Sequence, residues 1–221
     1  MSPVSGHDFG MYPTLKGIAS RGYKPACVLD IGAALGEWSR MAMQFWPEAR
    51  YFLVEPLLER QPALDELCRT HSNVDYILAG AADAPGRRSI GVMENLYASS
   101  FAYPGKDNRP ADVVTIDDLF RAGRFPQPQF MKLDVQGYEL KVLQGAVKAM
   151  PGCDLILLEL QFFRFTPEMP LLHEAVDWMA ARDFYPYEFV DFLRRPYDGA
   201  MGQCDLLFAR KDHWLLRSNR W

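Results

Sequence analysis

Two acidic side chains flank a glycine-containing turn early in the chain, where they could bind a nucleoside cofactor. Asp30 lies in the apolar run Val28–Ile31, directly before the turn Gly32–Gly36, and Glu55 ends the next apolar run, Tyr51–Val54. Glycine lets a backbone approach a ligand without a Cβ clash, and an acid ending a second strand can accept hydrogen bonds from ribose hydroxyls. The glycine spacing is G-x-x-x-G and not the G-x-G-x-x-G of dinucleotide sites.

The position of Asp30 favours a cationic ligand, because a carboxylate at the entrance of the turn would repel a pyrophosphate. S-adenosylmethionine carries an ammonium and a sulfonium, so we predict this cofactor and not NAD(P). A tight strand–helix turn with incidental acids is the structural alternative. The expected cofactor-binding residues are Asp30, Gly32, Ala33, Gly36, Glu55, Pro56, Ala82 and Asp134.

A second group of ionisable residues lies in two later apolar runs. Lys132 and Asp134 are two positions apart in the expected strand Phe130–Val135, so their side chains share one face. A lysine in a central strand requires a carboxylate partner, and we expect Asp134 or Glu159 to provide it. A purely structural ion pair is an equal alternative.

Three titratable side chains in or near these apolar runs are candidates for a general base. In order of preference they are Asp134, Glu159 and His173, and Lys132 completes the candidate catalytic set. His173 has the alternative of a helix-surface histidine. Asp117 and Asp118 follow Thr115 in the pattern of a helix cap, and we assign no metal to the chain.

Apolar strands alternate with helical segments along the chain, which predicts a doubly wound, Rossmann-like α/β sheet that is mostly parallel. The last two strands, Tyr187–Val190 and Asp205–Ala209, have no helical pattern between them, so we expect an antiparallel pair at the sheet edge. Asn95–Arg109 is expected to be a loop, and Tyr138–Ala149 a helix.

The chain has 221 residues, a net charge of −4 and no basic block, so we expect one compact domain that does not bind nucleic acid. The widely spaced cysteines and the absence of a long apolar run indicate a cytoplasmic protein without a membrane segment. We divide it into an N-terminal helical cap (1–25), a cofactor-binding domain (26–210) and a C-terminal tail (211–221), which leaves a homodimer contact open.

Motifs at four places in the chain resemble the FkbM family of S-adenosylmethionine-dependent methyltransferases. These motifs are Val28–Ala33, Val54–Pro56, Val114–Leu119 and Met131–Ala146. The resemblance extends over about Arg21–Ala209, and one departure is Gln136, where the family usually has Glu. The resemblance implies a class I methyltransferase sheet with one antiparallel strand near the C-terminal edge.

The resemblance also implies methylation of a hydroxyl oxygen, often on a sugar or secondary metabolite. We therefore expect an S-adenosylmethionine-dependent O-methyltransferase whose partner is a small hydroxylated acceptor. The alternatives are an NAD(P)-binding oxidoreductase or epimerase on the same architecture, and a cofactor-binding protein without catalysis.

Overall fold

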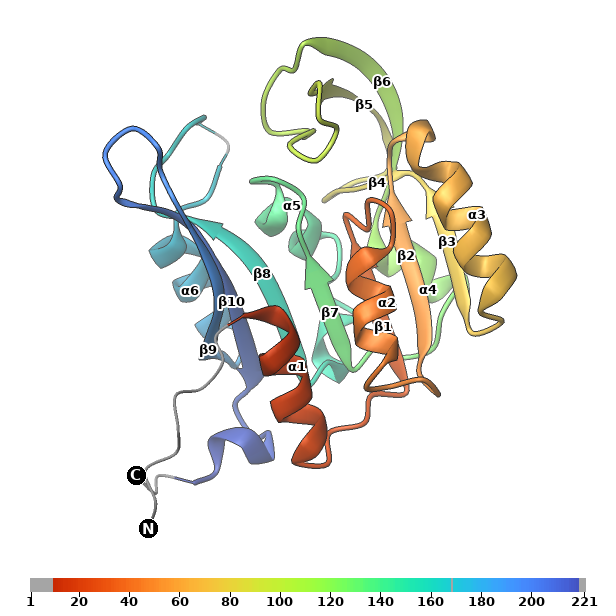
Figure 1. Cartoon of the computed structure of the whole chain (residues 1–221), viewed down its shortest axis with the longest axis vertical. Coiled ribbons are helices and arrows are strands. Elements are labelled where there is room, and N and C mark those ends of the chain that lie inside the picture. Colours follow the sequence, from red (N-terminus) through yellow and green to blue (C-terminus); the bar gives the residue numbers. More distant parts are fainter. Residues whose placement is uncertain (1–9, 168, 219–221) are drawn as a thin grey trace.

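The computed structural model of the chain describes residues 10–167 and 169–218. Its centre is a seven-stranded sheet in the order β3-β2-β1-β7-β8-β10-β9 (Figure 1). The strands of this sheet are β1 (Cys27–Ile31), β2 (Arg50–Glu55), β3 (Val74–Leu78), β7 (Phe130–Leu133), β8 (Leu155–Gln161), β9 (Phe184–Arg194) and β10 (Met201–Arg210). Only β10 runs antiparallel to its neighbours in this sheet, which confirms the predicted fold class and the single reversed strand near the C-terminal edge.

Helices cover both faces of the sheet, as a doubly wound fold requires. On one face lie α1 (Met11–Ser20), α2 (Glu37–Met43) and α3 (Gln61–Thr70), and on the other lie α4 (Ile116–Arg121), α5 (Glu139–Gln144) and α6 (Leu172–Ala180). Short 3-10 helices are η1 (Leu58–Arg60), η2 (Met150–Gly152) and η3 (Trp214–Leu216). Two separate apolar clusters, one for each face, hold the helices to the strands.

A second, three-stranded sheet lies beyond the ends of β2 and β3, at the top of Figure 1. It consists of β4 (Gly80–Ala81), β5 (Gly86–Val92) and β6 (Asp107–Val114), in the order β4-β6-β5. The sequence prediction of a loop up to Arg109 is therefore wrong at its end. Most of β6 is polar or exposed and it contains Pro110, so it has no apolar alternation, and pairing with β5 defines it.

The expected helix Tyr138–Ala149 is also shorter than predicted, because α5 ends before Gly145. A Cβ at Gly145 would lie 2.0 Å from the backbone oxygen of Ala82, so this glycine brings the helix end against the neighbouring chain. The amides of Lys148 and Ala149 donate to the Asp117 carboxylate, which places Asp117 in a structural role. Thr115 caps α4 by accepting from the Asp118 amide, as predicted.

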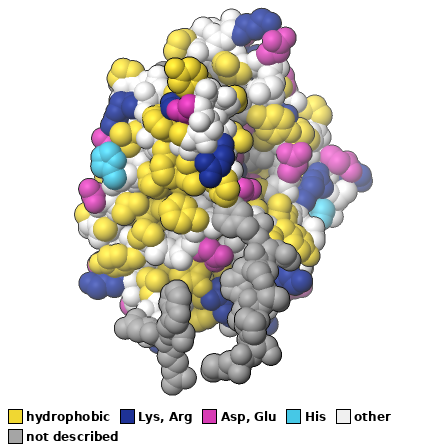
Figure 2. Space-filling view, turned by 60° about the vertical axis from the view of Figure 1, so that its left-hand side comes forward, with side chains coloured by type: hydrophobic (Ala, Val, Ile, Leu, Met, Phe, Trp, Pro, Cys, Tyr) yellow, Lys and Arg dark blue, Asp and Glu magenta, His cyan; other side chains and the backbone are white. Residues whose placement is uncertain are grey.

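The strand β9 forms the free edge of the main sheet, and its outer surface carries several large apolar side chains. Figure 2 shows hydrophobic side chains gathered on the face that includes this edge, among charged ones. The exposed members on β9 are Tyr185, Phe189, Phe192 and Leu193.

Among residues 10–167 and 169–218 there is no helix with the length and apolar character that a membrane span needs. Part of the predicted cap (residues 1–9) and the end of the predicted tail (residues 219–221) lie outside the described residues.

Candidate active site

A cavity opens at the carboxyl ends of β1, β2 and β7, where the strand order reverses between β1 and β7. Such a switch point is where open α/β sheets bind their ligands. The empty space between its walls, including the part that is open to solvent, is about 630 Å³. Of the residues predicted to bind cofactor, Gly32, Glu55, Pro56 and Asp134 line this cavity.

The turn after β1 brings the backbone of Gly32 close to the segment after β7. Gly32 has a φ of +77°, and a Cβ there would lie 1.9 Å from the backbone oxygen of Asp134. Gly36 has a different function from the one predicted, because it does not line the cavity. Its φ is +74°, and a Cβ there would lie 2.6 Å from Cδ2 of Leu67 on α3. Gly32 therefore belongs to the site, and Gly36 allows helix packing.

Glu55, at the end of β2, holds the entrance of the turn while facing the cavity. The amide of Ala34 donates to its Oε2 at 2.8 Å, and the amide of Leu57 donates to its Oε1 at 3.0 Å. Burial raises the pKa of Glu55 to about 7, although both amide hydrogen bonds lower it. Each carboxylate oxygen has a further lone pair, so Glu55 can still accept hydrogen bonds from a ligand.

The structure corrects the expected role of Asp30. Its side chain is completely buried, accepts a hydrogen bond from the Ser39 hydroxyl at 2.7 Å, and lies 3.3 Å from Nζ of Lys132. The Asp30 carboxylate thus faces protein groups behind the turn and does not lie at its mouth. It acts on a ligand only through Lys132 and the turn that both residues support.

Lys132 has the carboxylate partners that a buried lysine requires, but one of them differs from the prediction. Its Nζ lies 3.5 Å from Asp134 Oδ2 and donates to the backbone oxygen of Gly32 at 3.0 Å. Burial alone would lower the pKa of Lys132, but the charges of Asp30 and Asp134 outweigh it and raise the pKa. Lys132 is therefore protonated at neutral pH. Glu159, the other expected partner, has different contacts.

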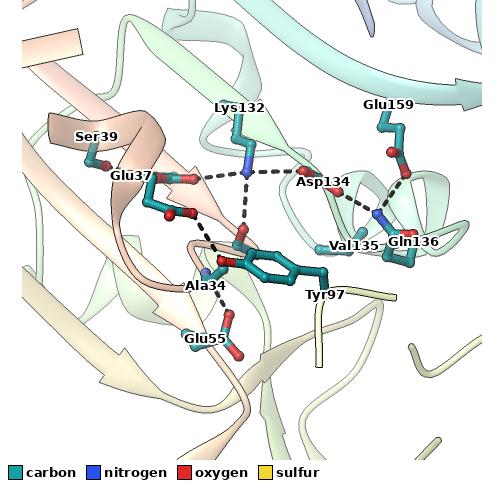
Figure 3. Close-up of polar contacts among 12 residues, drawn as sticks. Ala34, Glu37, Ser39, Glu55, Tyr97, Lys132, Asp134, Val135, Gln136 and Glu159 are labelled. Carbon is teal, nitrogen blue, oxygen red and sulfur yellow. Dashed lines mark hydrogen bonds and ion pairs between the residues drawn. The ribbon is translucent and has the colours of Figure 1, made fainter. Parts of the chain in front are cut away.

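Glu159 lies in a chain of carboxylates and amides that begins at Asp134 (Figure 3). Gln136 Nε2 donates to Asp134 Oδ1 at 2.7 Å and to Glu159 Oε2 at 2.9 Å, and Gln203 Nε2 donates to Glu159 Oε1 at 2.6 Å. Gln136 has a φ of +56°. Burial, followed by the charge of Asp134, raises the pKa of Glu159 well above its ordinary value. Two carboxylates are thus held close together by a neutral amide.

A second cavity adjoins the first along the turn and extends toward α1 and α2. Ala33, Lys132 and Asp205 line it, whereas Gly32, Ala34, Tyr97 and Asp134 line both cavities. Asp205 on β10 lies opposite Glu159 on β8, and burial raises the pKa of Asp205 to about 7. Asp134 therefore stands at the junction of the two cavities, in acidic surroundings.

The segment between β5 and β6 forms the roof over both cavities. Tyr97 lines both, and its hydroxyl donates to Glu37 Oε2 on α2 at 3.4 Å (Figure 3). Ser100 and Phe101 line the first cavity as well. Tyr97 and Phe101 thus supply two aromatic rings to the wall of the first cavity.

His173 and Ala82 join Asp30, Gly36 and Glu159 as predicted residues that line neither cavity. His173 is exposed on α6, which agrees with the alternative of a helix-surface histidine and removes it from the candidate bases. Ala82 is fully buried and its amide donates to the Val114 backbone oxygen, whereas the preceding residues Ala79–Ala81 line the first cavity.

The sequence analysis missed Arg60, which lines the first cavity from η1. The sequence gives no sign that this arginine is buried, because an arginine at the start of an amphipathic helix is usually exposed to solvent. Only the packing of η1 against the roof shows that Arg60 is buried.

The order of the main sheet, the glycine turn after β1 and the acid ending β2 define a Rossmann-like methyltransferase. A model of the methyltransferase FkbM domain matches residues 30–186 of this chain. The chain belongs to the FkbM methyltransferase family. This assignment agrees with the family resemblance and with S-adenosylmethionine, the cofactor predicted from the sequence.

Solved structures with a similar fold include an FkbM methyltransferase from Methylobacillus flagellatus, with a TM-score of 0.57, 18% identity, and coverage of 90% of this chain and 49% of that one. A precorrin-6y C5,15-methyltransferase from Geobacter metallireducens has a TM-score of 0.51 and 14% identity, covering 90% of this chain and 87% of that one.

Among curated proteins, the hexuronic acid methyltransferase AglP of Haloferax volcanii is 36% identical over 47 residues, which are 21% of this chain and 20% of that protein. The chain thus matches about a fifth of this curated relative.

Proposed function

We propose that the chain is an S-adenosylmethionine-dependent O-methyltransferase acting on a hydroxyl of a small polyhydroxylated molecule, such as a sugar or a secondary metabolite. The observation that carries this proposal is the position of Asp134, which lines both cavities and is 40% exposed at their junction. A carboxylate in that position can contact an acceptor hydroxyl next to a cofactor lying over the turn.

The residues of the first cavity suit the cofactor. Gly32 leaves the backbone surface of the turn without a side chain, and Glu55 offers acceptors for the ribose hydroxyls. Pro56 lines the same wall. Ala33 faces the second cavity, toward which the amino-acid portion would extend. These residues would hold the cofactor, and when bound it supplies a methyl group already activated by the sulfonium.

The protein then has two tasks, which are positioning and proton removal. Holding an acceptor in line can lower the barrier by about 7–11 kcal/mol. Asp134 is the preferred general base, because its carboxylate is accessible and Gln136 orients it through Oδ1. Accepting the hydroxyl proton at Asp134 would contribute about 10²–10⁴-fold in rate. Glu159, with both oxygens engaged by amides, is the second candidate.

A sugar hydroxyl as the acceptor is supported by two observations. The curated relative AglP is a hexuronic acid methyltransferase, and a hexuronic acid is a sugar acid. In this chain, carboxylates and amides alternate from Asp134 through Gln136 to Glu159. Such side chains provide both donors and acceptors, which a polyhydroxylated molecule requires.

Isothermal titration calorimetry tests the cofactor, using S-adenosylhomocysteine and NAD(P) with the purified chain. We expect S-adenosylhomocysteine to bind and NAD(P) not to bind. Binding of NAD(P) alone would favour the oxidoreductase or epimerase. Methyl transfer from labelled S-adenosylmethionine to a panel of sugars and other hydroxylated compounds then separates an enzyme from a cofactor-binding protein without catalysis.

A further inference from the structure

Arg60 is a buried cation, and two of its nitrogen atoms have no partner among the described residues. It lies in η1 and lines the first cavity, and only 6% of its surface is exposed. The buried atoms Nε and Nη2 have no hydrogen-bond partner within residues 10–167 and 169–218. Buried donors of a charged group are costly to leave without partners, so such an arrangement indicates a missing partner.

Packing explains only one face of this side chain. The guanidinium lies over the ring of Tyr97, with its carbon 4.4 Å from the ring centroid. A cation–π contact uses the face of the guanidinium and leaves the donors at its edge unsatisfied. By contrast, nearby Arg109 has its Nη2 satisfied by Glu59 at 2.6 Å, outside the cavity.

The two unsatisfied atoms lie on the same edge of the guanidinium. The Nε and Nη2 donors form a rigid fork that matches two adjacent oxygen acceptors. An adenine edge presents one acceptor next to one donor, so it does not match this fork. The vicinal hydroxyls of a ribose do match it, because each oxygen can accept a hydrogen bond as well as donate one.

Glu55 supplies the complementary half of such a site. It lines the same cavity, it can only accept hydrogen bonds while ionised, and the charge of Arg60 is among those that lower its pKa. A ribose diol between the two side chains would donate its hydrogens to Glu55 and accept from Arg60. Both hydrogens of the diol and one lone pair on each of its oxygens would then have a partner.

We propose that Arg60 is a ribose-binding residue, which donates from Nε and Nη2 to the diol oxygens whose hydrogens Glu55 accepts. This inference rests on the proposed function, because it takes the nucleoside of S-adenosylmethionine as the ligand. Beyond that function, it makes Arg60 the residue that selects a ribose cofactor over a deoxyribose one.

Calorimetric binding of S-adenosylhomocysteine and of its 2′,3′-dideoxy counterpart to wild type, Arg60→Gln and Arg60→Lys tests the inference. We expect both variants to bind S-adenosylhomocysteine about 10- to 100-fold more weakly than wild type, because a charged hydrogen-bond pair is lost. With the dideoxy compound the wild type and the variants should bind equally. Arg109→Gln is the matched control and should bind S-adenosylhomocysteine like the wild type.

Other outcomes would overturn the inference. If the Arg60 variants lose the same factor with the dideoxy compound, the arginine acts by packing on Tyr97. 5′-Methylthioadenosine keeps the ribose but has no carboxylate, so a loss with S-adenosylhomocysteine and none with 5′-methylthioadenosine would mean that Arg60 binds the amino-acid end. Failure of wild type to bind S-adenosylhomocysteine would instead refute the proposed function. Thermal denaturation of each variant shows that it is folded before binding is compared.

Discussion

Asp30 and Lys132 are direct partners across the two strands at the centre of the sheet, β1 and β7, and their charged atoms lie 3.3 Å apart. The same ammonium donates to the Gly32 backbone oxygen and lies 3.5 Å from Asp134. One buried cation therefore ties the cofactor turn to the residue that is expected to accept a proton. The charge of Asp30, which is buried on the side of Lys132 away from the cavity mouth, stabilises the ammonium in this position.

Lys132→Met should destabilise the protein strongly, because it leaves the completely buried Asp30 without a counter-charge. We expect a loss of about 3–5 kcal/mol in the free energy of unfolding, measured by urea denaturation. Lys141→Met is the matched control, since Lys141 is more exposed and pairs with Asp83 at the surface. The control should cost less than about 1 kcal/mol. Adding Asp30→Asn to Lys132→Met should restore part of the lost stability. Equal losses of stability in Lys132→Met and Lys141→Met would contradict the assigned role of Lys132.

Glu55→Ala should weaken binding of S-adenosylhomocysteine by about 10- to 100-fold, because ribose acceptors and the anchor of the turn are lost together. The Ala34 and Leu57 amides lose their acceptor, so a lower melting temperature should accompany the change. Glu59→Gln, whose side chain pairs with Arg109 at the surface, is the control and should leave affinity unchanged. Unchanged binding by Glu55→Ala would mean that this acid is only structural.

Asp134→Asn should lower methyl transfer by about 10²–10⁴-fold once an acceptor is known, because the amide cannot take up the hydroxyl proton. The partly exposed side chain should make the loss of stability small in comparison. Turnover and urea denaturation of the same preparation distinguish the two effects. A variant that merely unfolds would favour a structural ion pair with Lys132 over a catalytic function.

Gln136→Glu should make stability depend more steeply on pH. The amide at this position donates to both Asp134 and Glu159, and a third carboxyl there would meet two negative neighbours. Its folded-state pKa should be raised, so stability is retained at low pH and lost as pH rises. Urea denaturation at about pH 5.5 and 8 measures this, with exposed Gln44→Glu as control. The same pH dependence in both variants would contradict the prediction.

Glu139→Gln should flatten the dependence of stability on pH between about 4.5 and 7. Burial raises the folded-state pKa of Glu139 to about 7, above the ordinary value of 4.5. The folded state therefore binds the proton more tightly, and stability is lost as pH rises through this range by at most about 1.4 kcal/mol per pH unit. Both amide donors, Val135 and Gly137, use the same oxygen, Oε1, which glutamine retains. An unchanged slope would mean that Glu139 does not titrate there.

The sequence by itself determined the fold class and the family. Apolar strands alternating with amphipathic helices specify a doubly wound sheet, because each element must bury its apolar face. The places of Gly32 and Glu55 at one end of the sheet were also predictable, because a turn after the first strand and an acid ending the second parallel strand lie at the same sheet edge. These are local requirements that single residues display.

Only the tertiary structure decided which groups meet. Lys132 was predicted to need a carboxylate, but the choice of Asp30 depends on the register of β1 against β7. Arg60 became a candidate ligand-binding residue because η1 packs beneath the segment between β5 and β6. His173 is no longer a candidate general base because it lies on the exposed face of α6. Burial and contacts depend on elements that are distant in the chain, so the spacing of residues in the sequence does not predict them.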